Sequence, residues 1–246
     1  MTVQQPVKTQ PMTALVTGAT SGLGREIAER LARDGMDVIV VGRDPARGAA
    51  VVSEIEQAGG RARFIAADLS DPAEIQRLAE EVGEIDVLVN NAGQSVLGPT
   101  ESITAQDFDS IFATNVRAPF MLVGAFAPPM AAKGAGSIVN ISAMAGRIGM
   151  PGGAAYGATK AALASLTQGW TAEYSPRGVR VNAVAAGPIH TRPEARQRSD
   201  KLGDTTALHR ASEPSEIAEV VAFLASPRAS YVTGAIVAAD GGRTAI

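Results

Sequence analysis

Short runs rich in Val, Ile and Ala alternate along this chain with longer amphipathic stretches, and this alternation restricts its fold more than any other feature. Such runs separated by helix-length segments are typical of a parallel sheet with helices on both faces. The sequence therefore predicts an α/β fold built on a doubly wound sheet of about seven parallel strands. The strands are expected at residues 14–17, 37–42, 62–66, 87–90, 137–141, 180–184 and 236–239.

Several helices between these strands have clear signals in their first turns. Leu23, Ile27 and Leu31 recur at intervals of four, as a helix that packs on a sheet requires. Asp44 and Asp71 each provide a capping carboxylate directly before a proline. We therefore expect helices to begin at these two aspartates.

The chain is expected to form one domain over residues 12–246, because 46% apolar and 19% charged residues suit one large buried core. Residues 1–11 are polar, contain two prolines and are expected to be a flexible extension. Residues 188–212 are charged and lack clear periodicity. A loop of that length in a compact domain is usually a lid or binding loop, so we expect it to form the substrate side of a site.

The composition excludes several kinds of chemistry. The chain has no cysteine, and its two histidines, His190 and His209, stand apart, so neither thiolate chemistry nor a metal site is expected. A net charge of -3 without basic blocks argues against a nucleic-acid partner. No stretch is expected to approach the roughly 20 apolar residues of a membrane span. We therefore expect a cytoplasmic protein outside the membrane.

A glycine-rich loop, Thr17 to Gly24 with the sequence TGATSGLG, directly follows the first predicted strand. Glycines let the backbone approach a pyrophosphate closely. The N-terminus of the helix that follows offers free N–H groups and a partial positive charge. Because the loop stands between a strand and a helix, it predicts a dinucleotide site in a Rossmann fold.

The end of the second strand indicates which dinucleotide binds, because it lies about 20 residues beyond the glycines. Arg43 is suited to grip the 2'-phosphate of NADP with paired hydrogen bonds, and Gly42 leaves room for that phosphate. Asp44 is the alternative contact, to the ribose of NAD, although the proline behind it indicates a helix cap. We expect NADP(H) to be preferred, with NAD(H) as the alternative.

Tyr156 and Lys160 stand four residues apart in a stretch that reads as helix, so both side chains project from one face. An ammonium beside a phenol favours the phenolate. It lowers the tyrosine pKa from about 10 toward values that suit acid and base catalysis. Taken alone, the pair fits a core tyrosine beside a surface lysine better than a catalytic pair, and the remaining motifs reverse this interpretation.

Together, these motifs resemble the short-chain dehydrogenase/reductase family over residues 12–242. The family motifs fall on the loop 17–24, on Asp68-Leu69, on 90–93 (NNAG), on Asn115, on Tyr156 and Lys160, on 187–191 and on 240–242. The chain departs from the family at Ala186, where a proline is usual. It is similar to 3-oxoacyl-carrier-protein reductases and to glucose and alcohol dehydrogenases.

The resemblance implies an NAD(P)(H)-dependent oxidoreductase that interconverts a ketone or aldehyde and an alcohol by hydride transfer. Tyr156 would donate or accept the proton, Lys160 would lower its pKa and bind the nicotinamide ribose, and Asn115 would hold a water that links Lys160 to solvent. The implied cofactor site consists of Gly18, Thr20, Ser21, Gly22, Leu23, Gly24, Arg43, Asp68, Leu69, Asn91, Ala92, Gly93, Tyr156, Lys160, Gly187, Pro188, Ile189 and Thr191.

One catalytic position departs from the family pattern. The serine that polarises the substrate carbonyl falls on Ala143. Ser142 stands next to it, but neighbouring residues of a strand face opposite sides, so it could substitute only if the strand bends or bulges. Ser142 is therefore either a catalytic donor or a structural hydroxyl. Loss of one donor slows such reactions about 10² to 10³-fold, so a weakened enzyme is expected; Ala143 as an engineered substitution is a further reading.

A second hypothesis, suggested by Ala143, is a cofactor-binding sensor or scaffold without turnover. A nucleotide-sugar epimerase or dehydratase is a weaker third, because such relatives carry a larger C-terminal substrate domain. The expected substrate is a small carbonyl or alcohol compound, or an acyl thioester attracted by the mild positive excess of residues 188–212. The resemblance implies a homotetramer, with a dimer as the alternative.

Overall fold

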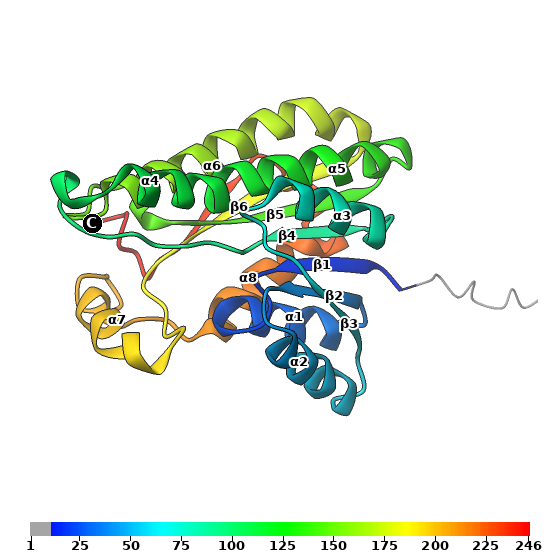
Figure 1. Ribbon diagram of the computed structural model, residues 1–246, viewed down its shortest axis with the longest axis horizontal. Coiled ribbons are helices and arrows are strands. Elements are labelled where there is room, and N and C mark those ends of the chain that lie inside the picture. The colour runs from blue at the N-terminus through cyan, green and yellow to red at the C-terminus, as the bar shows by residue number, and fades with distance from the viewer. Residues whose placement is uncertain (1–10) are drawn as a thin grey trace, which may run out of the picture.

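The computed structural model describes residues 11–246, so the predicted extension at 1–11 lies outside the described residues except for Pro11. A seven-stranded sheet forms the centre of the molecule, in the order β3-β2-β1-β4-β5-β6-β7 (Figure 1). Every strand pair is parallel, which confirms the predicted fold class. The strands are β1 (Thr13–Thr17), β2 (Asp37–Gly42), β3 (Arg61–Ala66), β4 (Val87–Asn90), β5 (Gly136–Ala143), β6 (Val179–Ala186) and β7 (Ile236–Ala239).

The predicted strand positions are confirmed, but β5 and β6 run two residues further at their carboxyl ends. Ser142 pairs with Ala185 and Ala143 pairs with Ala186 in the same register as the residues before them. These small residues have weak strand preference and showed no strand pattern in the sequence. They stay in the sheet because the neighbouring strands provide their hydrogen bonds.

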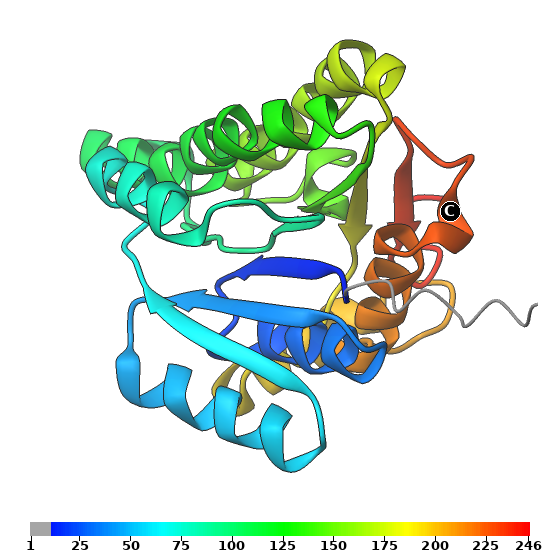
Figure 2. The ribbon, with the colours of Figure 1, turned by 90° about the vertical axis from the view of Figure 1, so that its right-hand side faces the viewer.

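Helices cover both faces of the sheet, as predicted (Figure 2). Helices α1, α2 and α8 share one hydrophobic core with one face, and α3, α5 and α6 share a second core with the other. The helices are α1 (Gly22–Arg33), α2 (Pro45–Gln57), α3 (Pro72–Val82), α4 (Ala105–Phe112), α5 (Ala118–Ala132), α6 (Ala154–Tyr174), α7 (Arg196–Gly203) and α8 (Pro214–Ala225).

The predicted helix starts are confirmed in their atomic detail. The Asp44 carboxylate accepts hydrogen bonds from the backbone N–H groups of Ala46 and Arg47 at 3.0 and 3.1 Å. The Asp71 carboxylate accepts one from Ala73 at 2.9 Å. Each carboxylate satisfies N–H groups that a helix start leaves without an intrahelical partner.

A π-helical turn, Ala113–Arg117, joins α4 to α5 in one long helical run. The run Ala105–Ala132 is long and apolar enough to cross a membrane by length and composition, so the expectation that no stretch approaches a span is wrong. Half of its most apolar window is buried inside the protein, and α5 packs against α3 and α6. Core helices of large sheets have the same composition.

The segment 188–212 is not the unstructured loop that its lack of periodicity predicted. It contains α7, which lies beyond the carboxyl ends of the strands on the side of α1 and α8 (Figure 1). The buried residues of α7 are Ser199 and Gly203. A helix with so small and polar a buried face leaves no apolar stripe for sequence reading to detect.

Candidate active site

A cleft of about 290 Å³ lies at the carboxyl ends of β1 to β4, where β1 and β4 are neighbours. The order of the sheet reverses at this point, and ligands of open α/β sheets bind in such a crevice. Six segments far apart in sequence meet there. Of the predicted cofactor residues, those that line it are Gly18, Thr20, Ser21, Gly22, Leu23, Gly24, Arg43, Asp68, Leu69, Asn91, Ala92, Gly93 and Thr191.

The glycine loop is packed so closely that side chains at its glycine positions would clash with neighbouring atoms. A Cβ on Gly24 would lie 2.2 Å from the carbonyl oxygen of Gly18, and Gly18 itself has a φ of +62°. Asn91 fixes the loop from β4, because its Nδ2 donates to the Thr17 carbonyl at 2.8 Å. The cradle leaves backbone at its surface beside the N-terminus of α1, and this arrangement fits a pyrophosphate.

The end of the cleft at β2 carries two arginines. Arg43 follows Gly42, and Arg47 lies in the first turns of α2, where its Nε donates to Asp44 at 2.7 Å. A Cβ on Gly42 would lie 2.6 Å from the methyl group of Thr20, so a larger residue there would displace Thr20. Sequence reasoning missed Arg47, although its spacing of three from the capping Asp44 placed it on the same helix face.

Other lining residues were also missing from the predicted set. They are Ala67, Gln94, Thr114 and Arg192. Gln94 and Thr114 contact each other, with Gln94 Nε2 donating to Thr114 Oγ1 at 3.0 Å. Thr191 approaches the glycine loop closely, since a Cβ on Gly22 would lie 3.2 Å from the Thr191 carbonyl. The segment after β6 therefore reaches over the cleft to the start of α1.

Lys160 and Asn115 converge at the edge of the cleft. A Cβ on Gly93 would lie 3.2 Å from Asn115 Oδ1 and 3.5 Å from Lys160 Nζ. Lys160 is buried, and its ammonium donates to the Ile141 carbonyl at 2.9 Å. Burial lowers the pKa of Lys160 to about 8. A lysine with such a pKa can bind and release a proton near neutral pH.

The side chain of Asn115 makes three hydrogen bonds to its neighbours. Its Nδ2 donates to the Gln94 carbonyl at 2.9 Å and to Thr159 Oγ1 at 3.0 Å, and its Oδ1 accepts from the Gln94 N–H at 2.8 Å. Thr159 Oγ1 in turn donates to the Tyr156 carbonyl at 2.7 Å. Asn115 thus ties the segment after β4 to the N-terminal part of α6.

Tyr156 lies one helical turn before Lys160, and Lys160 Nζ is 5.7 Å from the centre of its ring. The expectation that Lys160 lowers the pKa of Tyr156 is not met in this structure. Burial raises the pKa of Tyr156, and the cation that opposes this rise is Arg198 of α7. Desolvation outweighs the attraction of charges that are distant or partly neutralised.

Ser142 has a defined partner next to this site. Its hydroxyl is buried and donates to the Lys160 carbonyl at 2.9 Å. The register of β5 with β6 continues through Ser142 to Ala143, so the strand keeps its alternation of faces. A hydroxyl has one proton to donate, and here that proton is already committed.

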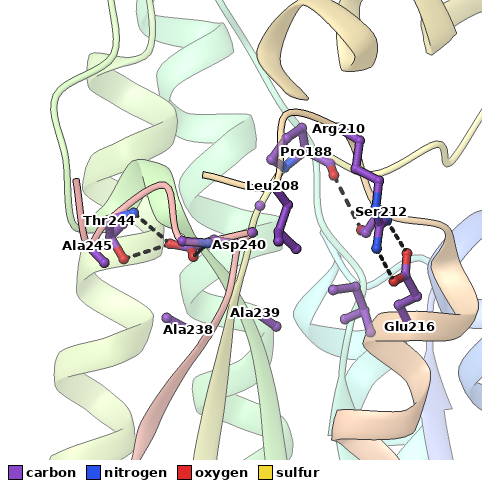
Figure 3. Close-up of a pocket in the computed structure, with 14 residues that line it drawn as sticks. Pro188, Leu208, Arg210, Ser212, Glu216, Ala238, Ala239, Asp240, Thr244 and Ala245 are labelled. Atoms are coloured by element: carbon purple, nitrogen blue, oxygen red, sulfur yellow. Dashed lines mark hydrogen bonds and ion pairs between the residues drawn. The ribbon is translucent and has the colours of Figure 1, made fainter. Parts of the chain in front are cut away.

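Tyr156, Lys160, Gly187, Pro188 and Ile189 lie outside the lining of the cofactor cleft. Gly187 and Pro188 instead line a separate cavity of about 410 Å³ between β7, the start of α8 and residues 208–212 (Figure 3). Asp240 closes one side of it, and its carboxylate accepts hydrogen bonds from Gly242 and Thr244. Most polar side chains that line this cavity are hydrogen-bonded to other groups of its lining, whereas the cofactor cleft exposes backbone groups.

The family model described as short chain dehydrogenase matches residues 12–202. Cyclopentanol dehydrogenase of a Comamonas species is 36% identical, over 94% of this chain and 96% of that protein. The 3-oxoacyl-[acyl-carrier-protein] reductase of Staphylococcus epidermidis is 37% identical, over 93% of this chain and 97% of its own length. The solved structure of a 3-oxoacyl (acyl-carrier-protein) reductase from Agrobacterium tumefaciens with NADP bound has a TM-score of 0.89 and 32% identity, covering 94% of this chain and 93% of that one.

Among residues 11–246, the structure brings together no group of three or more acidic or histidine residues that could hold a metal ion.

Proposed function

This chain belongs to the short-chain dehydrogenase family, and we propose that it interconverts a ketone or aldehyde and the corresponding alcohol with NADP(H). The observation that carries the proposal is the convergence of Lys160 and Asn115 beside Gly93, one helical turn from Tyr156. A buried lysine and a buried tyrosine at the edge of a dinucleotide-type cleft are suited to proton transfer.

A bound nicotinamide ring would supply or accept hydride at its C4, which is the cofactor's own chemistry. In the reducing direction, Tyr156 gives its phenolic proton to the carbonyl oxygen of the substrate. Lys160, with a pKa near 8, holds a positive charge beside the phenolate that forms and can return a proton. The Asn115 side chain holds Gln94 and Thr159 in place, and a water held at Asn115 would connect Lys160 to solvent.

The enzyme is expected to be slow because Ala143 has no hydroxyl to donate to the developing oxyanion. Ser142 is a structural residue in this account, because its hydroxyl is bonded to Lys160. Loss of one oxyanion donor costs about 10² to 10³ in kcat. Proximity of the reactants and proton donation by Tyr156 remain, and each contributes substantial acceleration.

The preference for NADP(H) over NAD(H) rests on the two arginines at the β2 end of the cleft. Arg43 and Arg47 both line it. Position 42 is a glycine, so it places no acidic side chain that would repel a 2'-phosphate. The NADP bound to the relative from Agrobacterium tumefaciens supports the same cofactor here. Residues 67–69 line the cleft beside Arg43, and Asp68 is held by hydrogen bonds from Ser70.

The substrate class follows from the relatives and from the charge of the lid, residues 188–212. The named relatives act on a cyclic alcohol or on an acyl thioester of a carrier protein. In this lid Arg210 is paired with Glu216. Arg192 lines the cofactor cleft, and the positive charge of Arg198 opposes the rise in the pKa of Tyr156. A small carbonyl compound or an acyl thioester is therefore the proposed substrate, and steep salt dependence would identify the thioester.

NADPH oxidation tests the proposal against a panel of cyclic ketones, aldehydes and 3-oxoacyl thioesters. At least one substrate should be reduced, and that activity should disappear in Tyr156→Phe. The second candidate function, cofactor binding without turnover, is favoured by Ala143 and by the raised pKa of Tyr156. It would give a change in NADPH fluorescence on binding and no oxidation with any member of the panel.

A homotetramer and a cytoplasmic location complete the proposal. Helices α4 and α5 carry the exposed side chains of Phe108 and Phe120, which a partner subunit would cover. Light scattering checks the assembly, and a monomer at working concentration would contradict it.

A further inference from the structure

His190 lies between two carboxylates from two different elements. Its Nδ1 is 2.9 Å from Glu213 Oε1, at the start of α8, and its Nε2 is 2.7 Å from Asp200 Oδ1 of α7. The imidazole exposes only 11% of its surface, so these contacts are its main polar partners. The proposed reaction makes no use of this residue.

This geometry fits a protonated ring best. Ionised carboxylates only accept hydrogen bonds, whereas neutral imidazole has one N–H donor and one lone pair. A neutral ring would direct its lone pair at one of the two carboxylates. An imidazolium donates to both, and such charge-assisted hydrogen bonds are the strong ones.

The surrounding charges agree with that state. The hydrogen bonds that the ring donates to Glu213 and to Asp200 raise the pKa of His190, against desolvation and the positive charge of Arg196. Arg196 itself reaches Glu213 at 4.0 Å. Carboxylates and guanidinium groups keep their charges between about pH 6 and pH 9, so the imidazole is the group in this cluster that changes.

Three parts of the lid meet at His190. The His190 N–H donates to the Ser212 carbonyl at 3.0 Å, and Ser212 N–H donates to the Pro188 carbonyl at 2.9 Å, which pairs the two ends of the lid. Ser199 of α7 donates to the Ile189 carbonyl at 2.9 Å. Thr191, the next residue, reaches over the glycine loop. His190 therefore joins α7 to the segment after β6 that covers the cofactor cleft.

A second anchor of the lid does not depend on pH in this range. Arg210 binds the Glu216 carboxylate through both nitrogens at 2.7 Å, which Figure 3 shows beside Ser212. The Arg210 guanidinium lowers the pKa of Glu216 to about 2. Leu208 N–H also donates to the Gly241 carbonyl at 3.1 Å. The returning end of the lid thus stays attached when His190 loses its proton.

We propose that His190, as an imidazolium, is a positioning residue that clamps α7 over the site, and that its deprotonation releases α7 while the returning end of the lid stays anchored. The consequence for catalysis, a site that opens as pH rises, rests on the proposed function. The clamp itself can be measured without turnover.

The linkage between proton binding and folding gives the direction in which pH changes the stability of the clamp. A histidine whose pKa is raised by folding contributes stability that is fully present below its ordinary pKa of about 6.5 and is lost as pH rises through the raised value. The α7 amides should therefore be protected at about pH 6 and exchange faster above the raised pKa. Loss of one charge-assisted hydrogen bond predicts a change of about tenfold in protection.

The experiment uses the whole chain labelled at histidine for NMR, together with hydrogen exchange of α7 relative to α1. The chain has two histidines, so His209→Gln assigns both imidazole signals. We expect His190 to titrate above about 6.5 and the protection of α7 to fall with the same midpoint, after correction for intrinsic exchange. A His190 midpoint at or below about 6.5 would contradict the proposed clamp. Equal α7 protection at about pH 6 and above the raised pKa would contradict it as well.

Asp200→Asn is the matched variant. The amide keeps the shape of Asp200 and can donate to a neutral ring, so the clamp should no longer need the extra proton, and α7 protection should become independent of pH. Asp204→Asn changes the same charge at the end of α7, away from His190, and should keep the pH dependence of the original chain. Equal loss of pH dependence in both variants would also contradict the proposal.

Discussion

The Ser142 hydroxyl donates a 2.9 Å hydrogen bond to the carbonyl oxygen of Lys160. This bond ties the end of β5 to the helix that carries Tyr156 and Lys160. It also removes Ser142 as a free donor and leaves Ala143, with only a methyl group, at the position where the family places its catalytic serine.

Replacing Ala143 with serine should raise kcat about a hundredfold, because it restores a donor to the developing oxyanion. The measurement is kcat at saturating NADPH for a substrate found in the panel. KM should change much less, since the donor acts mainly in the transition state. Unchanged kcat in a folded Ala143→Ser protein would show that another group already fills this role.

Replacing Ser142 with alanine should lower the free energy of unfolding by about 1 kcal/mol, because the buried Lys160 carbonyl loses a partner. Urea unfolding measures this loss. The kcat should fall less than about tenfold, far below the effect of losing an oxyanion donor. A fall of a hundredfold or more with unchanged stability would instead make Ser142 the catalytic hydroxyl.

Lys160→Met should abolish turnover and stabilise the fold at neutral pH. Folding lowers the pKa of Lys160 from 10.5 to about 8, so the folded state binds fewer protons between these values. Below about pH 8 the folded protein therefore carries the full penalty of a buried ammonium, about 3 kcal/mol, and this penalty disappears as pH rises toward 10.5. Loss of the bond to Ile141 offsets about 1 kcal/mol of the gain.

Urea unfolding of Lys160→Met and of the original chain at about pH 7 and pH 10 checks this prediction. The variant should be the more stable protein at the lower pH, and its advantage should shrink at the higher pH. An advantage that grows with pH would contradict the lowered pKa of Lys160.

Arg43→Ala should weaken NADPH binding about tenfold or more, because a charged hydrogen bond contributes about 1.5 to 3 kcal/mol. Binding of NADH, which lacks the 2'-phosphate, serves as the internal control and should change less than about threefold. The dissociation constants are measured by cofactor fluorescence. Equal losses for both cofactors would mean that Arg43 does not recognise the phosphate.

The sequence predicts the strands and the glycine loop well because β-branched runs and glycines act locally. It does not predict α7, whose buried face is made by Ser199 and Gly203, or the end of β5, where Ala143 is held by its partner strand. These elements depend on contacts between distant segments, which leave no periodic pattern.

In the site, too, some features follow from local sequence and others depend on contacts between distant segments. The positions of Asn115 and Lys160 around Gly93 follow from motifs, but the direction of the Tyr156 pKa does not, because burial is a property of the folded chain. His190 looked isolated in the sequence. Its partners are ten and 23 residues away and meet only through the path of the lid.

The most direct test of the central claim is transfer of deuterium from NADPH dideuterated at C4 to a carbonyl substrate, followed by mass spectrometry of the alcohol. One deuterium is expected in the product, at a rate that falls at least about a hundredfold in Tyr156→Phe. An alcohol without deuterium, or an unchanged rate in Tyr156→Phe, would contradict hydride transfer with Tyr156 as the proton donor.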